Sequence, residues 1–434
     1  MIKNAFIEIW GETVGAVAWN ETTGIASFEY DPKFTQLTWD LAPIKMPISQ
    51  GSRIFSFSEL RAARNSEFDT FKGLPGLLAD VLPDKYGNQL INVWLAQNGR
   101  PTDSMNPVEQ LCFIGTRGMG ALEFKPAQFK NKQAFTIEVK SLVEMAQKML
   151  SKRDDFEENL QEGEEKAMVE ILKIGTSAGG ARPKAVIAYN EKTNEVRSGQ
   201  AKSPKGFEHW LIKLDGVSDA QFGESKGYGR VEMAYYLMAK SCGIDMMECK
   251  LLEENGRAHF MTKRFDREGN DTKHHVQTFC AMQHFDFNEV TSFSYEQLFQ
   301  TMRLLRLPYP QAEQMYRRMV FNVLARNCDD HTKNFAFMMK QGQQWEITPA
   351  YDICHAYQPN HRWVSQHALS INGKRKDITK EDLLSVAKSM NIKKAKTIVM
   401  EISEKVSLWD KYASIAKVGQ ELREAIKSTL IRMH

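Results

Sequence analysis

Residues 327–337, NCDDHTKNFAF, place two acids, a His, a Lys and an Asn within six consecutive positions, with apolar residues on both sides. Asp329 and Asn334 in this segment are five residues apart. The catalytic loop of protein kinases, H-R-D-x-x-x-x-N, has the same spacing: its Asp orients the acceptor hydroxyl and takes its proton, and its Asn binds Mg²⁺. The spacing alone is weak evidence, because it often arises by chance and a charged surface loop has the same composition.

A second acid suited to metal binding follows in TPAYDICHA, residues 348–356. Asp352 lies shortly after the strand-like QWEIT, as the D-F-G Asp of kinases follows the catalytic loop by a short hairpin. Ile353 and Cys354 stand in place of Phe and Gly, so the D-F-G signature is absent. Asp352 can still bind Mg²⁺, because this ion needs hard oxygen ligands and not the two residues that follow.

A cation for phosphate binding is found in HWLIKLD, residues 209–215, where Lys213 interrupts an apolar strand pattern. Kinases use a strand Lys in V-A-I-K to hold phosphates and to pair with a helix Glu. Glu232 lies nineteen residues further on in a predicted helix, and Glu224 is also within reach by sequence. The alternative is a Lys on an exposed strand edge.

A glycine-rich segment, KIGTSAGGARPK at 173–184, precedes another predicted strand. Such loops let backbone N–H groups approach an anion closely. Gly175 and Gly180 fit the G-x-x-x-x-G part of a Walker A motif, but Ala181 occupies its Lys position. A glycine-rich turn alone is more often structural. The order of these signals along the chain is nevertheless that of a bilobal kinase.

The composition is that of an ordinary globular protein: 434 residues, 42% hydrophobic, 26% charged, with a net charge of +3. No global polybasic character points to nucleic acid, although a local basic patch remains possible. The six Cys form no C-x-x-C pair and show no metal-ligand spacing, which favours free thiols in a reducing compartment. We find no signal peptide and no apolar run of about 18 residues, and therefore expect a soluble cytoplasmic protein without membrane spans.

Hydrophobic periodicity predicts the elements that must position these residues. Period-2 runs in the first thirty residues predict an antiparallel meander, and apolar spacing at three and four predicts a helix over 76–97. A glycine-punctuated turn and strand are expected over 113–124, and a short amphipathic helix over 141–150. Strands follow in KAVIAYN, HWLIKLDG and on both sides of ENGR, a helix ends at Gly243, and the chain beyond 295 is mainly helical.

These patterns predict an α+β fold: a bilobal, protein-kinase-like fold with an N-terminal β-rich subdomain and a large α-helical C-terminal lobe. The predicted domains are a β-rich subdomain at 1–130, an α/β lobe with the phosphate loop and strand Lys at 131–270, and a helical lobe with the catalytic loop and metal-binding Asp at 271–434.

The motifs SAGGARPK, IKLD, KRFDR, CDDHTKNF and AYDI together resemble the HipA serine/threonine kinases, the toxins of bacterial HipA–HipB toxin–antitoxin systems. GLLADVLPDKYGNQLI and FIGTRGMGALEF resemble the family's N-terminal domain, so the resemblance spans nearly the whole chain in the right order. It implies a catalytic Asp at 329, with Asn334 and Asp352 as Mg²⁺ ligands. The ATP-binding residues that it implies are Gly179, Gly180, Ala181, Arg182, Pro183, Lys184, Lys213, Lys263, Arg264, Phe265, His331, Lys333, Asn334, Tyr351 and Asp352.

Within that resemblance, Lys213 holds the ATP phosphates and residues 263–265 form the hinge against adenine, largely through backbone. The family autophosphorylates a Ser of the phosphate loop, which ejects the loop and switches the kinase off. Ser177 matches that position best, and Thr176 is adjacent. Asp330 stands where the family can hold a Gly; either acid could approach the hydroxyl, and the spacing to Asn334 favours Asp329.

The resemblance also implies partners. Family members phosphorylate components of translation, such as aminoacyl-tRNA synthetases, and bind a HipB-like helix-turn-helix antitoxin that represses the operon on operator DNA. The basic cluster of Lys374, Arg375 and Lys376 is the candidate DNA contact, with a solvated turn as its alternative. Two other functions stay open: a catalytically inactive relative that acts as a corepressor, and a small-molecule kinase.

Overall fold

The computed structural model describes residues 2–62, 69–128, 136–151, 175, 182–199, 203–219, 223–224, 227–269 and 272–433. The chain divides into two compact units. Unit 1 comprises Met1–Gly229, Lys250–Val276 and Lys340–Gly342, and unit 2 comprises Arg230–Cys249, Gln277–Met339 and Gln343–His434. Among the described residues, none of the helices has both the length and the apolar character that crossing a bilayer requires.

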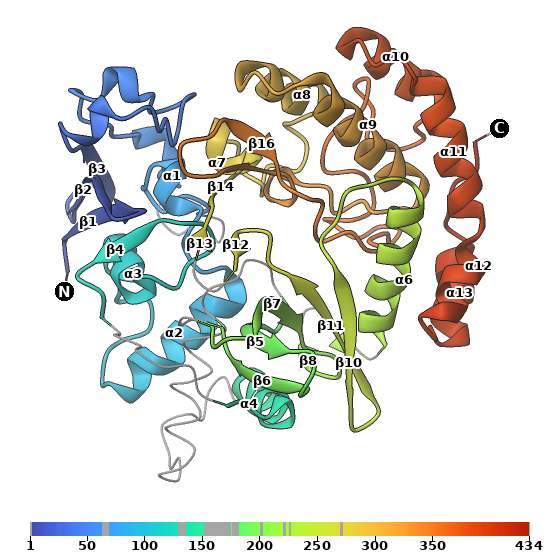
Figure 1. Ribbon diagram of the computed structural model, residues 1–434, viewed down its shortest axis with the longest axis horizontal. Helices are drawn as coiled ribbons and strands as arrows, with labels where there is room; N and C mark the ends of the chain where they lie inside the picture. Colours follow the sequence, from blue (N-terminus) through green and yellow to red (C-terminus); the bar gives the residue numbers. More distant parts are fainter. Residues whose placement is uncertain are drawn as a thin grey trace. The chain divides into compact units, whose positions relative to one another are not determined.

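Unit 1 begins with the predicted antiparallel meander, which the structure confirms (Figure 1). Strands β1 (Asn4–Ile9), β2 (Glu12–Asn20) and β3 (Ile25–Tyr30) are joined by β4 (Glu123–Lys125) in the order β3-β2-β1-β4. The strands form because their apolar residues alternate: Ala5, Ile7 and Ile9 are buried on one face, while Phe6 is exposed on the other.

The helix predicted over 76–97 is two helices, α1 (Gly76–Ala79) and α2 (Lys85–Gln97). The break has a local cause, because Pro83 has no backbone N–H to donate and the Asp84 side chain caps α2 by accepting a hydrogen bond from Gly87 N at 2.9 Å. Helix α3 (Pro107–Ile114), capped by Asn106, occupies the start of the stretch for which we expected a turn and strand. The expected strand, β4, follows at its end.

The larger sheet of unit 1 has the order β10-β11-β7-β5-β6. Its strands are β5 (Lys184–Asn190), β6 (Glu195–Ser198), β7 (Glu208–Lys213), β10 (Cys249–Glu254) and β11 (Arg257–Lys263). Asn255 and Gly256, both at positive φ, close the predicted turn between β10 and β11. Short ladders pair β8 (Ser218–Asp219) with β9 (Gly223–Glu224) and β12 (Arg267–Glu268) with β13 (Thr272–Lys273).

Helices α2 and α4 (Val139–Ser151) cover this sheet (Figure 1). Tyr86 and Leu90 of α2 lie in one hydrophobic cluster with Leu142 of α4 and with Trp210 and Ile212 of β7. Since α2 comes from the first hundred residues and β7 from beyond residue 200, the N-terminal segment and the larger sheet share one core. Strand β7 is central, so Lys213 at its end has strand neighbours on both sides, Lys184 and Phe260.

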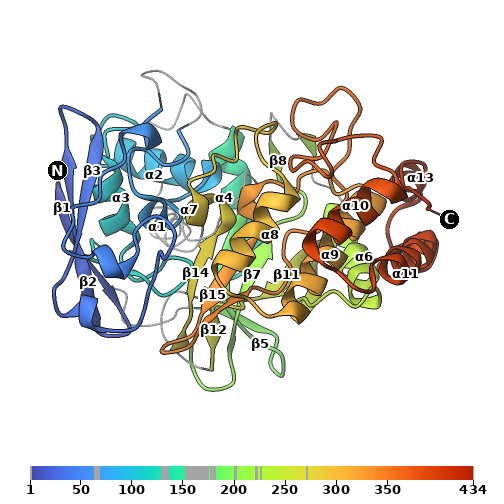
Figure 2. The ribbon, with the colours of Figure 1, turned by 90° about the horizontal axis from the view of Figure 1, so that it is seen from above.

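Unit 2 is mainly helical, as predicted (Figure 2). Its helices are α6 (Tyr228–Ser241), α7 (Phe279–Gln283), α8 (Tyr295–Leu304), α9 (Tyr309–Leu324), α10 (Lys380–Met390), α11 (Ala395–Ser407), α12 (Trp409–Ile415) and α13 (Gln420–Lys427). The second half of α9 is deeply buried, with nearly all residues from Met315 to Leu324 inside. Strand β14 (His275–Thr278), whose last two residues belong to unit 2, forms a sheet with β15 (Ala336–Met339) and β16 (Trp345–Ile347) in the order β14-β15-β16.

Candidate active site

The segment that carries the predicted catalytic residues leaves the end of α9 and turns sharply at Arg326, which has a φ of +55°. Two backbone hydrogen bonds then join it to the stretch after β16: Cys328 N donates to Ala356 O at 3.0 Å, and Ala356 N donates to Arg326 O at 3.0 Å. These bonds bring the residues around Asp352 beside residues 327–334, so the two predicted motifs meet although they are distant in sequence.

Asn334 ends a short 3₁₀ helix, η4 (Thr332–Asn334), that closes the loop on itself. Its Nδ2 donates to the backbone O of Asp329 at 2.6 Å, and its N donates to His331 O at 2.9 Å. With its amide N–H engaged inside the loop, Asn334 keeps its carbonyl oxygen as an acceptor for a cation. The five-residue spacing therefore has a structural reason: it is the length that lets Asn334 brace the backbone at Asp329.

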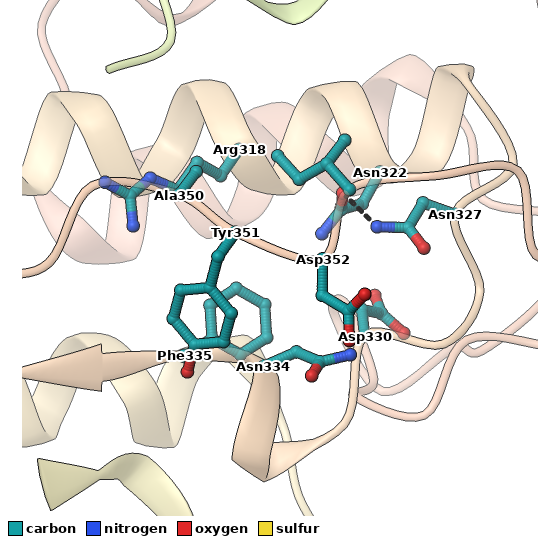
Figure 3. A pocket seen from close by; sticks show the side chains of 10 residues that line it. Arg318, Asn322, Asn327, Asp330, Asn334, Phe335, Ala350, Tyr351 and Asp352 are labelled. Atoms are coloured by element: carbon teal, nitrogen blue, oxygen red, sulfur yellow. Dashed lines mark hydrogen bonds between the residues drawn. The ribbon is translucent and has the colours of Figure 1, made fainter. Parts of the chain in front are cut away.

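Asp352 has a φ of +53°, a left-handed conformation that non-glycine residues adopt at a cost and that is common at functional sites. Asp352 and Asn334 line one small pocket of about 10 Å³, room for about one water-sized sphere, and Figure 3 shows their side chains close together. The pocket is lined by Arg318, Asn322, Asn327, Asp330, Asn334, Phe335, Ala350, Tyr351, Asp352 and Ile353. A carboxylate and an amide oxygen at a space of this size suit Mg²⁺, which binds through one or two protein ligands and completes its shell with water and phosphate.

The two adjacent acids differ in environment. The side chain of Asp330 is fully buried, whereas that of Asp329 is 48% exposed. Neighbouring side chains of an extended backbone point to opposite sides, so burying one carboxylate directs the other outward. Of the two adjacent acids, Asp329 is the one whose side chain reaches solvent, and its role as the catalytic acid stays a prediction from its spacing to Asn334.

His331 and Lys333 belong to this loop, and Tyr351 is hydrogen-bonded to it. The Tyr351 hydroxyl donates to Lys333 O at 2.7 Å, and Lys333 Nζ lies 4.7 Å from the centre of the Phe287 ring. The His331 ring is 5.3 Å from the same Phe287 ring, and its Nε2 is 3.8 Å from Asp329 Oδ1. Phe287 was not identified from the sequence, because a single aromatic residue forty positions before the loop carries no motif. Arg318 and Asn322 were also missed, since the periodicity of α9 indicates only a buried helix, and Asn327 follows that helix without a motif of its own.

Residues 176–409 match the family description "HipA-like C-terminal domain", and residues 6–125 match "HipA N-terminal domain". The first match alone covers more than half of the chain. The chain belongs to the HipA family.

Two solved structures are similar to this chain to different degrees. A chain in the structure of the Shewanella oneidensis MR-1 toxin–antitoxin system HipA, HipB and its operator DNA has 17% identity and a TM-score of 0.68, with 98% of this chain and 94% of that chain covered. This likeness confirms the predicted α+β, kinase-like fold class. The Helicobacter pylori proinflammatory kinase CtkA has 13% identity over 51% of this chain and 88% of its own, with a TM-score of 0.31. Among curated protein sequences, no match is significant.

The remaining nucleotide-site residues expected of a HipA protein belong to unit 1. Arg182 lies with its guanidinium 4.5 Å from the centre of the Tyr228 ring. The Lys184 side chain is buried, and its ammonium is 3.6 Å from the Asp84 carboxylate. Lys213 is half-buried, with Nζ 5.9 Å from the centre of the Phe260 ring. Thr176, Ser177, Gly179, Gly180 and Ala181 lie outside the described residues.

The predicted hinge, residues 263–265, is tied closely to its own unit. Lys263 Nζ pairs with Glu208 at 2.5 Å, and Arg264 N donates to His209 O at 2.9 Å. The Arg264 guanidinium donates two hydrogen bonds to Asp266, at 2.8 and 2.6 Å. The Arg264 side chain therefore has a structural task, which is compatible with a hinge that acts through backbone. Of the two predicted partners for Lys213, Glu224 lies on β9 and Glu232 is buried on α6.

The basic cluster expected to contact DNA is only partly available for that role. Lys374 Nζ donates to Asp382 Oδ2 at 2.9 Å while its side chain remains half exposed. Arg375 donates to the backbone oxygens of Ala368 and Phe293, so its guanidinium is occupied within the fold. Lys376 is exposed. Within the cluster, the two lysines are the residues that can reach a phosphate.

Proposed function

We propose that this chain is an ATP- and Mg²⁺-dependent protein serine/threonine kinase that acts as a toxin of the HipA type. The observation that carries the proposal is the arrangement in unit 2, where Asn334 and Asp352 share one pocket and the half-exposed Asp329 stands on the loop that Asn334 braces. Asn334 and Asp352 thus supply oxygen atoms that can bind Mg²⁺, and Asp329 supplies a carboxylate that can accept a proton. Phosphoryl transfer requires both kinds of group.

In this proposal Asp329 orients the acceptor hydroxyl and accepts its proton. The Asn334 and Asp352 oxygens hold Mg²⁺, which when bound neutralises charge on the transferred phosphoryl group. Lys213 and the phosphate loop, residues 179–184, would hold the phosphates, and Lys263–Phe265 would contact adenine through their backbone. His331, Lys333 and Tyr351 would also contact the nucleotide.

The partners in the proposal follow from the family and from the similar complex, which contains HipB and operator DNA. We propose a helix-turn-helix antitoxin of the HipB type, operator DNA bound through the toxin–antitoxin complex, and a protein substrate in translation such as an aminoacyl-tRNA synthetase. Loop autophosphorylation at Ser177 or Thr176 would inactivate the kinase, because a dianionic group repels the phosphates that the loop must bind.

The test is transfer of radiolabelled γ-phosphate from ATP by the purified full chain, with and without Mg²⁺. We expect autophosphorylation that Asp329→Asn reduces at least about a hundredfold, the lower end for loss of a general base. Glu289→Gln, an acid in unit 2 outside the proposed site, serves as the control and should transfer normally. Transfer to metabolites alone would support a small-molecule kinase, and a wild-type chain without transfer or nucleotide binding would support an inactive corepressor.

A further inference from the structure

The Asp330 carboxylate is among the most completely hydrogen-bonded groups of unit 2. Its Oδ2 accepts hydrogen bonds from the Tyr295 hydroxyl and from His367 Nδ1, each at 2.8 Å, and its Oδ1 accepts one from Ala368 N at 2.7 Å. The carboxylate and the imidazole are both buried. A buried carboxylate is tolerated only when it is paired and hydrogen-bonded in this way.

The groups that bind Asp330 are also connected to Asn327 and Cys328, the residues just before Asp329. The Tyr295 hydroxyl accepts a hydrogen bond from Asn322 Nδ2 at 3.0 Å, and Asn322 Oδ1 accepts one from Asn327 Nδ2 at 3.0 Å. Cys328 Sγ lies 3.8 Å from His367 Nε2. The side chains of Asn327, Cys328 and Asp330 therefore each contact buried groups of unit 2. The side chain of Asp329, in the same run of residues, is half exposed.

The partner of Asp330 is itself fixed. His367 N donates to Arg375 O at 2.9 Å, and Arg375 in turn binds the backbone oxygens of Ala368 and Phe293. Ser370 N donates to Phe293 O at 3.0 Å, and Tyr295 N donates to Ser370 O at 3.0 Å, which joins this stretch to the start of α8. The loop residue Asp330 therefore binds to a stretch that is itself hydrogen-bonded to Arg375 and to the start of α8.

We propose that Asp330 and His367 form a positioning pair that holds the backbone at Asp329, so that the Asp329 carboxylate faces the acceptor hydroxyl. Asp330 lines the same pocket as Asn334 and Asp352, but its carboxylate oxygens are engaged by Tyr295, His367 and Ala368, and in this proposal it acts through Asp329. The inference rests on the proposed kinase function and deepens it, because it assigns separate tasks to two acids that are adjacent in sequence. It also gives Arg375 a task inside the fold, as the brace of the stretch that carries His367.

The charges support the pairing. Burial by itself lowers the pKa of His367, but the Asp330 carboxylate, with Cys328 as a further contact, outweighs burial and raises it above the ordinary value. The Tyr295 hydroxyl donates to the same carboxylate, and the Arg375 guanidinium adds a further positive charge in its neighbourhood. Replacing Asp330 by Asn takes away the negative charge and one acceptor oxygen from the buried His367 and Tyr295 side chains, and this loss displaces the loop.

The experiment compares Asp330→Asn with Asp382→Asn in the full chain. Asp382 is a matched control, a buried acid of unit 2 that binds Lys374, Asn372 and the Thr379 backbone and caps α10 instead of the loop. We expect Asp330→Asn to lower kcat about 10- to 100-fold, as a misplacement of about 1 Å does, while the KM for ATP changes less than about twofold. Asp382→Asn should keep kcat within about twofold, even if it lowers the melting temperature as much.

A kcat for Asp330→Asn equal to that of the wild type, or a fall matched by Asp382→Asn, would overturn the proposal. So would a rise in the KM for ATP as large as the fall in kcat, because the pair would then serve nucleotide binding. Should Asp330→Asn not fold, Tyr295→Phe removes one hydrogen bond to the same carboxylate without leaving a charge, and kcat should fall about threefold to tenfold.

A second measurement separates this proposal from the kinase function. Amide hydrogen exchange reports loop order without any activity: residues 327–335 should exchange faster in Asp330→Asn, while α11 should not change. If the wild type transfers no phosphate, the proposed function fails, and the exchange experiment still decides whether Asp330 orders the loop. Unchanged exchange at 327–335 would show that it does not.

Discussion

Replacing Asp266 by Asn tests the reasoning about unit 1 most directly. The Asp266 carboxylate is fully buried and accepts hydrogen bonds from Arg264 Nε and Nη2 at 2.8 and 2.6 Å, from Arg267 Nη1 at 2.6 Å and from Gly120 N at 2.7 Å. Arg267 also donates to Gly118 O and Gly120 O. The carboxylate therefore holds two guanidinium groups and the glycine turn that follows α3.

The expected loss of stability follows from these contacts. Asn keeps one acceptor oxygen, but its NH₂ faces two guanidinium groups that no longer have a counter-charge. Breaking a buried ion pair by removing one partner costs about 3–5 kcal/mol. At about 2–4 °C per kcal/mol for a unit of this size, the apparent melting temperature of unit 1 should fall by about 6–20 °C in scanning calorimetry.

The matched control is Glu268→Gln, two residues away. Glu268 pairs with His274 at 3.0 Å and with Lys340 at 3.5 Å, but its side chain is exposed, and exposed pairs contribute little. We expect no measurable change in melting temperature for this variant. If Asp266→Asn melts within about 2 °C of the wild type, the buried triad does not hold the turn, and the energetic reasoning is wrong.

The same acid predicts a pH dependence. Burial alone raises the pKa of Asp266, but Arg264 and Arg267 outweigh burial and hold it well below the ordinary value. A carboxyl whose pKa is lower in the folded state contributes stability above its unfolded pKa, near 3.9, and loses it as the pH falls further. Unit 1 of the wild type should therefore lose stability steeply below about pH 4, and the Asp266→Asn variant should show a shallower loss. Parallel curves for the two proteins would contradict this assignment.

Three further outcomes are expected. Ser177→Asp should weaken ATP binding through charge repulsion in the phosphate loop, and an unchanged affinity in calorimetry would refute the switch. Asp352→Asn should weaken nucleotide binding in the presence of Mg²⁺ more than in its absence, and equal losses in both titrations would argue against a metal ligand. Lys376→Ala should lower the dependence of operator binding on salt, measured as the slope of log K against log salt concentration, by about 1 in band-shift titrations of the antitoxin complex. Arg375→Ala should mainly lower the melting temperature. An unchanged slope for Lys376→Ala would show that Lys376 does not contact DNA.

Much of this protein could be predicted from sequence because the relevant signals are local. Alternation predicted the meander, and period-3.6 spacing predicted α6, α8 and α9, since each pattern repeats within a few residues. The pairing of Asp329 with Asn334 was equally local, because both residues belong to one short loop. Where local rules compete, boundaries were missed: Pro83 and Asp84 divide the helix predicted over 76–97 into two.

The sequence by itself determined the family, the fold class and the set of acids and amides at the proposed site. Only the tertiary structure decided which of two adjacent acids faces outward, because Asp330 is buried by His367 and Tyr295, which lie 37 and 35 residues away along the chain. The same holds for Phe287 beside Lys333 and for Arg375, whose carbonyl partners turn a predicted surface cation into a brace. Burial and hydrogen bonding depend on which segments, distant in the sequence, pack against a residue. The local pattern of residue types does not specify those segments.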